Sequence, residues 1–174
     1  MNIHSLHHYL TNLSESEEHY RSGYPFSGWS QLPKVQIHGR EVYRMFPDNL
    51  IFSSMHGENP VSGQNFDIPV GLQDISIKQN SRFNPVPEHV HSHIEINYVY
   101  SGTCPQHIDG KPVLLKKDQV LLIDTDCPHS IDTLGENDIM ISMLIRKEFL
   151  RDRMFSQFSK DSVLSRFFVN ALTE

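Results

Sequence analysis

Hydrophobic positions follow a helical period at the start of this chain. Apolar residues there recur at intervals of three or four, which predicts an amphipathic helix over the first twenty or so residues. These residues are Ile3, Leu6, Leu10 and Leu13. Ser14–Glu17 has the form of a capping box for a second helical turn. Gly23 and Pro25 then predict the end of the helical region.

The pattern changes between about Val35 and Leu144. Short β-branched and aromatic runs alternate there with Gly, Pro, Asn and Asp, which is typical of an all-β sandwich or barrel. The predicted strands are Glu41–Phe46, Leu50–Ser54, Gly71–Lys78, Ile94–Tyr100, Gln106–Ile108, Val113–Leu115, Val120–Asp124 and Ile139–Leu144. Asp109 and Gly110 predict a tight hairpin turn, because both central residues of such a turn need a positive φ.

After Ile145 the apolar period becomes helical again. Large apolar residues form one stripe over residues 149–158 and another over residues 164–171, which predicts two amphipathic helices. The second pattern reaches Glu174 without a Gly or Pro stop signal, so we expect a longer protein. The predicted organisation is an N-terminal arm and barrel in residues 1–145, followed by dimerisation or linker helices in residues 146–174.

Composition narrows the classes of function. The chain has 174 residues and a formal net charge of −6, so its long-range field repels phosphate backbones, and this chain alone is not expected to bind DNA. It has no apolar run near the ~20 residues that span a bilayer and no secretory signal pattern. We therefore expect a cytoplasmic protein with no membrane partner. Cys104 and Cys127 have no paired-ligand spacing and are expected to be free thiols.

The stretch PEHVHSHIEINYVYSG, residues 87–102, concentrates polar chemistry on one face of a predicted strand. Because successive side chains of a strand alternate between faces, five polar residues share one face. They are His89, His91, His93, Glu95 and Asn97. The opposite face is apolar and aromatic. It carries Ile94, Ile96, Tyr98 and Tyr100.

The spacing of these residues resembles the first motif of the cupin superfamily. His89 and His91 stand two apart, three residues then precede Glu95, and six more precede Gly102. The later stretch DQVLLIDTDCPHSI resembles the second cupin motif and supplies His129. The resemblance implies a single cupin barrel, which is a double-stranded β-helix or jelly roll. It also implies a metal-binding set formed by His89, His91, Glu95 and His129.

One branch of the superfamily is more similar still. The stretches IEINYVYSG, IDGK and LLIDTDCPHSI, followed by two amphipathic helices, resemble the amino-terminal sensor domain of AraC/XylS-type bacterial transcription regulators. The resemblance covers about residues 80–172. It departs from the family where glycines are expected: Phe83, Asp118 and Asp126 stand at those positions. It implies a small-molecule effector, with a sugar as the family-level expectation, a homodimer, and DNA contacts through a C-terminal domain beyond this chain.

Three interpretations of the polar face remain open. Three imidazoles and a carboxylate suit a divalent transition metal, namely Ni, Zn, Mn or Fe. The same groups, with His93, Asn97 and His107, can instead hydrogen-bond a small polar effector without a metal. In the third interpretation the histidines are solvated residues at the mouth of the barrel.

The leading functional hypothesis is an effector-sensing and dimerisation domain that is not an enzyme. The alternative is a metal-dependent cupin enzyme, an isomerase or oxygenase acting on a small molecule. Such an enzyme needs a further acid or base, and the sequence indicates no catalytic residue for that task.

Overall fold

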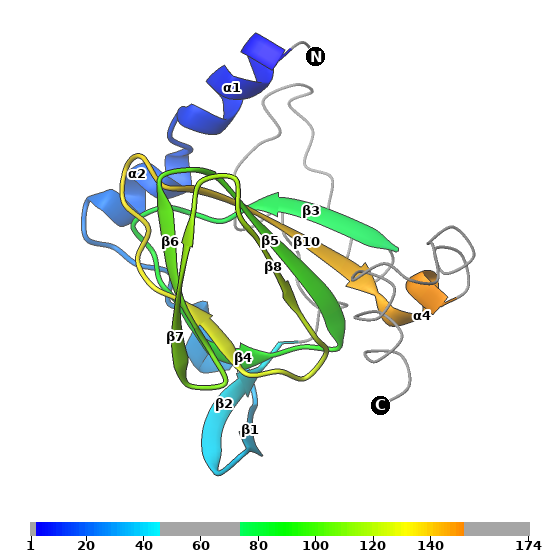
Figure 1. The fold of residues 1–174 in the computed structure, drawn as a ribbon. Helices are drawn as coiled ribbons and strands as arrows, with labels where there is room; N and C mark the ends of the chain where they lie inside the picture. The colour runs from blue at the N-terminus through cyan, green and yellow to red at the C-terminus, as the bar shows by residue number, and fades with distance from the viewer. Residues whose placement is uncertain (1–2, 46–73, 152–174) are drawn as a thin grey trace.

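Two β-sheets face each other and enclose the interior of this protein (Figure 1). The computed structural model describes residues 3–45 and 74–151. The six-stranded sheet runs in the order β1 (Lys34–Ile37), β2 (Arg40–Arg44), β4 (Val86–Val90), β9 (His129–Ile131), β6 (Thr103–Ile108) and β7 (Lys111–Lys116). The four-stranded sheet runs in the order β3 (Ile75–Gln79), β10 (Ile139–Arg146), β5 (His93–Ser101) and β8 (Val120–Ile123). The fold is therefore mainly β with a jelly-roll-like arrangement, as the sequence predicted.

Most neighbouring strands are antiparallel, and the pair β2–β4 is parallel. Between the sheets lies an apolar cluster of Val99, Cys104, Leu115, Ile131, Leu134 and Met140. The β6–β7 hairpin turns at Asp109 and Gly110, whose φ angles are +48° and +76°. This confirms the predicted hairpin, since both residues occupy the left-handed region that such a turn requires.

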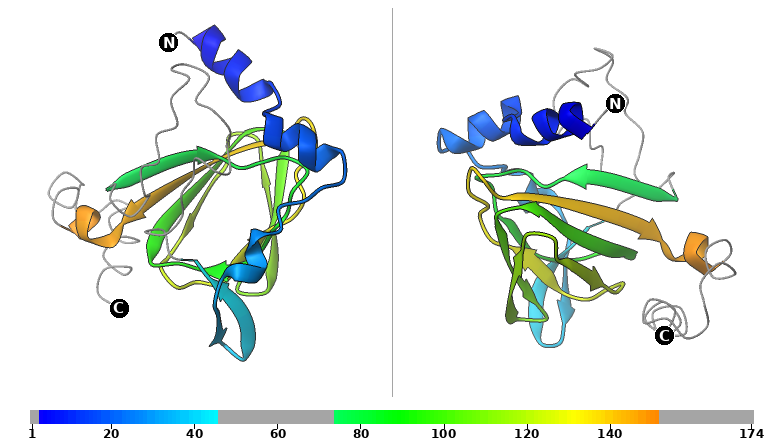
Figure 2. Two further views of the ribbon diagram at one scale, coloured as in Figure 1. Left: turned by 180° about the vertical axis from the view of Figure 1, so that it is seen from behind. Right: turned by 45° about the horizontal axis from the view of Figure 1, so that its top comes forward.

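Helical segments lie outside the barrel (Figure 2). They are α1 (Ile3–Thr11), α2 (Glu15–Arg21), the 3₁₀ turn η1 (Gly28–Gln31) and the short α4 (Lys147–Phe149). The sequence predicted one N-terminal helix with a capping box, and the structure has two helices with that box at the start of α2. The Glu17 amide donates to Ser14 Oγ, and the Ser14 amide donates to Glu17 Oε2. None of the helices described here is long and apolar enough to cross a membrane.

A buried ion pair fastens the N-terminal helices to the barrel. The guanidinium of Arg82, which follows β3, donates to both carboxylate oxygens of Glu17 at 2.9 and 2.8 Å. It also donates to the carbonyl oxygens of Thr11, Asn12 and Glu136. One cation therefore joins the turn between α1 and α2 to the loop before β10.

The histidine-rich segment is not the single strand that the alternation pattern predicted. β4 ends at Val90 in one sheet, and β5 begins at His93 in the other. His91 and Ser92 carry the chain between the sheets, and the His91 carbonyl accepts from the Asp126 amide outside either ladder. A chain that passes from one sheet to the other must leave the first ladder, which is why the strand is interrupted here.

Some predicted elements fall outside the described residues. The strand Leu50–Ser54 lies there entirely, as do residues 152–174 with most of the two predicted C-terminal helices. The strand predicted at Gly71–Lys78 is described from Asp74 onward, and it is β3. β1, β4 and β9 were not predicted as separate strands.

Candidate metal centre

Four side chains from three strands and one connection meet in the barrel interior. His89 lies on β4, His129 on the neighbouring β9, Glu95 on β5 of the other sheet, and His91 in the connection between β4 and β5. Each offers one ligand atom, and these four atoms all lie within 4.8 Å of one another. All four residues are at most 3% exposed. The strand register explains part of this convergence, because His89 pairs directly with His129 and their ring centroids are 4.1 Å apart.

Backbone carbonyls orient the three imidazole rings. Nδ1 of His89 lies 2.9 Å from the carbonyl oxygen of Pro87, and Nδ1 of His129 lies 2.8 Å from that of Cys127. Nδ1 of His91 lies 3.0 Å from the carbonyl oxygen of His93. A carbonyl oxygen only accepts hydrogen bonds, so each Nδ1 carries the proton and donates it. In a neutral ring, Nε2 is then left with a free lone pair.

The Glu95 carboxylate lies where two of these lone pairs point. Its Oε2 is 2.8 Å from His91 Nε2 and 3.2 Å from His129 Nε2. Carboxylate oxygens and unprotonated ring nitrogens are all acceptors, so they repel one another unless a cation lies between them. That cation is either a proton shared with one of the rings or a metal ion.

Burial sets the protonation states in this cluster. It lowers the pKa of His89 well below its usual value, with the neighbouring imidazoles acting in the same direction. Burial also lowers the pKa of His91, although Glu95 partly opposes the shift. For Glu95 burial alone would raise the pKa, but the contacts with His129 and His91 outweigh it and hold the pKa well below the usual range. Neutral imidazoles and an ionised carboxylate are the forms in which these groups bind metals.

The donor set therefore fits a divalent transition metal. His89, His91 and His129 would supply nitrogen ligands, and Glu95 would supply an oxygen ligand. The carbonyl partners of the three Nδ1 atoms hold the rings in the tautomer that metal binding requires. The convergence of these four residues is what the cupin-like spacing implied.

A chain of buried amides and a hydroxyl continues from the cluster along the interior. The Ser142 hydroxyl donates to Asn97 Oδ1 at 2.6 Å, and Asn97 Nδ2 donates to Gln106 Oε1 at 3.3 Å across the two sheets. Asn80 Nδ2 donates to the Ser142 hydroxyl at the other end. Asn97, predicted as a ligand-binding residue, is thus an interior polar group.

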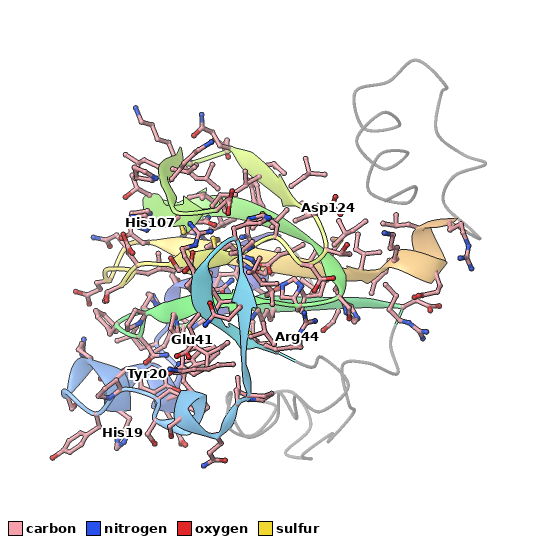
Figure 3. All side chains as sticks on the ribbon, turned by 90° about the horizontal axis from the view of Figure 1, so that it is seen from below. His19, Tyr20, Glu41, Arg44, His107 and Asp124 are labelled. Carbon is pink, nitrogen blue, oxygen red and sulfur yellow. The ribbon has the colours of Figure 1, made fainter. Side chains whose placement is uncertain are left out.

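The other two predicted ligand-binding residues are placed differently. His93 is buried at the start of β5, but it is not one of the four clustered residues. His107, labelled in Figure 3, has a side chain that is 42% exposed, and its Nδ1 lies 3.6 Å from Asp132 Oδ1. Strand alternation turns its neighbour Gln106 inward instead, where it is 1% exposed, so a ligand-binding role of His107 stays a prediction.

Sequence reasoning missed several interior polar residues. Gln106 and Ser142 were passed over, although each stands in a predicted strand at an inward position. Trp29 in η1 lies close to the cluster, and its ring centroid is 6.2 Å from that of His89. The alternation of β6 and β10 could have indicated Gln106 and Ser142 once one inward residue of each strand was known.

The family described as AraC-like ligand binding domain matches residues 77–154, a stretch that includes all four clustered residues. No curated protein matches the chain.

Solved structures that match part of the chain include two cupins and a DMSP lyase. An RmlC-like cupin from Shewanella frigidimarina has 16% identity and a TM-score of 0.36, and the match covers 41% of this chain and 66% of the other. A cupin protein from Bacteroides fragilis has 18% identity and a TM-score of 0.38, covering 54% of this chain and 80% of the other. The DMSP lyase DddQ from Ruegeria pomeroyi has 17% identity and a TM-score of 0.36, covering 42% and 39%. Similarity at this level says nothing about the ligand of this chain.

Proposed function

We propose that this chain is the effector-sensing part of an AraC-like transcription regulator. A small polar ligand binds in the barrel beside a divalent metal, which is held by His89, His91, Glu95 and His129. Asn97 and the groups bonded to it form the polar wall of that pocket. The match to the AraC-like ligand binding domain supports a sensing role.

The observation that carries the proposal is the orientation of the three imidazoles. Each ring donates its Nδ1 proton to a backbone carbonyl, so the three Nε2 atoms and the Glu95 carboxylate form a buried group of acceptors. Buried acceptors without donors are costly, and a cation removes that cost. A metal bound there, when present, supplies a Lewis-acidic position for an oxygen atom of the ligand.

The proposal extends to the organisation of the protein. Residues 1–145 form the arm and the effector-binding barrel, and residues 146–174 provide dimerisation and linker helices. The working unit is a cytoplasmic homodimer, and a C-terminal domain outside this chain contacts DNA. Effector binding then favours one of two arrangements of the arm or the C-terminal helices. This requires that the effector binds the protein more tightly in one arrangement than in the other.

Metal analysis tests the pocket. The purified chain is expected to hold about one transition-metal ion per chain by elemental analysis, and His91→Ala is expected to lose at least 10-fold in metal affinity because one ligand is gone. His107→Ala is the matched control, since this imidazole is exposed and outside the cluster, and it is expected to bind as the unmodified chain does. Equal metal content in the two variants would contradict the proposed ligand set.

The coding sequence after Glu174 tests the proposal that this chain is part of a transcription regulator. We expect the coding sequence to continue past Glu174 into two helix-turn-helix units rich in Lys and Arg, which would supply the positive charge that the present residues lack. A stop codon directly after Glu174 would exclude this proposal and leave a binding protein without a DNA partner, or an enzyme.

The same cluster would also serve a metal-dependent cupin enzyme. That alternative predicts turnover of a small molecule by the metal-loaded chain. It further predicts that turnover, and not only binding, disappears in His91→Ala. A full-length protein that binds DNA in an effector-dependent way, with no turnover of that effector, would exclude the enzyme.

A further inference from the structure

The single tryptophan of the chain packs beside the candidate metal centre. Trp29 lies in η1, and its ring centroid is 6.2 Å from that of the His89 imidazole and 6.2 Å from that of the Tyr43 ring. Tyr43 on β2 pairs directly with His89 on β4, so the indole lies beside two residues that are neighbours in the sheet. The segment between α2 and β1 therefore brings an aromatic ring to one of the four clustered residues.

His89 is the member of the cluster that Glu95 does not hold. Among the described residues, the Glu95 carboxylate contacts the rings of His91 and His129, and no hydrogen bond joins it to His89. The hydrogen bond from Nδ1 to the Pro87 carbonyl oxygen fixes the tautomer of His89. The direction in which its Nε2 points also depends on what packs against the ring.

Other rings surround the His89 imidazole. Its centroid lies 4.1 Å from that of His129, 5.6 Å from that of His91 and 6.2 Å from that of Trp29. Two of these rings belong to the cluster itself, and Glu95 contacts both. The indole comes from outside the cluster, and rings that pack in contact restrict one another's rotation. Trp29 is therefore able to hold His89 independently of Glu95 and of a metal.

The barrel in turn fixes the position of Trp29. The Phe26 amide donates to Asn84 Oδ1 at 3.0 Å, and Asn84 is 7% exposed. The Phe26 ring meets the indole edge-on, with the two centroids 5.6 Å apart. A Cβ atom on Gly28 would collide with the Phe26 ring, so this glycine leaves the space that the ring occupies. These contacts keep η1 next to β2 and β4.

We infer that Trp29 is a positioning residue of the metal centre. Its indole packs against the His89 imidazole and keeps Nε2 directed toward the other three ligands, so the site is formed before a metal binds. A ligand that is already in place loses less conformational entropy on binding, which raises the affinity and slows the release of the metal. This inference rests on the proposed function, because it concerns the same metal site.

Cobalt tests the inference, because the visible absorption of Co²⁺ depends on the geometry of its ligands. The full 174-residue chain is loaded with Co²⁺, its spectrum is recorded, and release is started with an excess of chelator. Trp29→Ala is expected to bind Co²⁺ about tenfold more weakly, to release it faster and to change its spectrum, because His89 is no longer held. Trp29→Phe keeps an aromatic ring and is expected to restore most of the affinity and the original spectrum.

The fluorescence of Trp29 gives a second measurement on the unmodified chain. Co²⁺ bound by the cluster is expected to quench the emission strongly, because the ion accepts excitation energy from a nearby indole. Zn²⁺ has a filled d shell and is expected to bind without this quenching. The emission comes from one tryptophan, so its change reports on this position alone. Bound Co²⁺ that leaves the emission unchanged would overturn the inference.

Tyr24→Ala is the matched control. Tyr24 is an aromatic residue of the same segment, but it is 62% exposed and stacks on His19 of α2. This variant is expected to keep the cobalt affinity and the spectrum of the unmodified chain.

Three outcomes would contradict the inference. Unchanged cobalt affinity and spectrum in Trp29→Ala would overturn it and leave the metal site intact. An equal loss of affinity in Trp29→Ala and Tyr24→Ala would also overturn it, because the whole segment would then act through folding. Failure of the unmodified chain to load cobalt would instead overturn the proposed metal site, and the inference with it.

Discussion

Three residues that stand where the cupin-like pattern would have glycine hold the backbone conformation that glycine usually provides. Phe83, Asp118 and Asp126 have φ angles of +62°, +66° and +56°. These are the positions where the sequence departs from the pattern it resembles. A side chain in the left-handed region costs about 1–2 kcal/mol. Each of these turns therefore has a left-handed residue although that residue is not glycine, and local hydrogen bonds help to hold them, as between the Asp118 amide and the Val99 carbonyl.

Asp118 offers a clean test of this conformation. Asp118→Gly and Asp118→Ala both remove the hydrogen bond that the Tyr98 hydroxyl donates to this carboxylate, so the two variants differ in the Cβ atom. The glycine variant is expected to be more stable by about 1 kcal/mol, because only the alanine is strained at positive φ. Urea unfolding of the two proteins measures the difference. Equal stabilities would contradict a left-handed residue at this turn.

At the scale of elements, α2 is held by its capping residue as well as by packing. Glu17 closes the capping box with Ser14 and also binds the buried guanidinium of Arg82. Burial alone would raise the pKa of Glu17, but the hydrogen bonds from Arg82 and Ser14 outweigh it and lower the pKa below 4.5. One carboxylate therefore defines the start of a helix and its attachment to the barrel.

Removing the negative charge of Glu17 should weaken the attachment of α2 to the barrel. Glu17→Gln is expected to lower the free energy of unfolding by about 3 kcal/mol or more at pH 7, since it leaves Arg82 buried without its counter-ion. Glu18→Gln is the control, because Glu18 pairs with Arg21 on the exposed side of the same helix and such pairs contribute below about 1 kcal/mol. Urea unfolding monitored by circular dichroism gives both values.

The contribution of Glu17 depends on pH with a definite sign. Its pKa is lower in the folded state than the value of 4.5 in the unfolded chain, so its stabilisation is complete above that value. It is lost as the pH falls through the folded pKa. The stability difference between the unmodified chain and Glu17→Gln should therefore shrink below about pH 4.5. A difference that grows on acidification would rule out this ion pair as its source.

At the scale of the whole molecule, the proposed metal site joins the two sheets. His89 and His129 come from the six-stranded sheet and Glu95 from the four-stranded sheet. A metal bound by all of them would stabilise the folded state, because the unfolded chain does not hold these groups together. Metal binding is thus expected to affect the stability of the entire barrel.

Thermal unfolding measures this coupling. Ni²⁺ or Zn²⁺ at a hundred times its Kd should add about 2.7 kcal/mol to the free energy of unfolding and raise Tm by several degrees, and a chelator should reverse the shift. The shift should be greatly reduced in His91→Ala and unchanged in His107→Ala. A metal-induced increase of equal size in both variants would indicate binding elsewhere on the chain.

Local patterns were sufficient to predict much of the fold. Alternating apolar residues predicted β5, β8 and β10 at nearly their observed positions, and Asp109–Gly110 predicted the hairpin. The spacing of His89, His91 and Glu95 predicted that these residues would meet. These features depend on neighbours within a few residues, and such short-range relations can be read directly from a sequence.

The sequence by itself therefore determined the β character of the chain, its turns and the types of residue at the site. Only the tertiary structure decided that the histidine segment passes between two sheets, that Gln106 rather than His107 faces inward, and that Lys78 on β3 lies directly opposite Ser142 on β10. The physical reason is that register and sheet pairing join residues far apart in the chain. A shift of one position exchanges the two faces of a strand, and local pattern does not fix that choice when both faces carry polar residues.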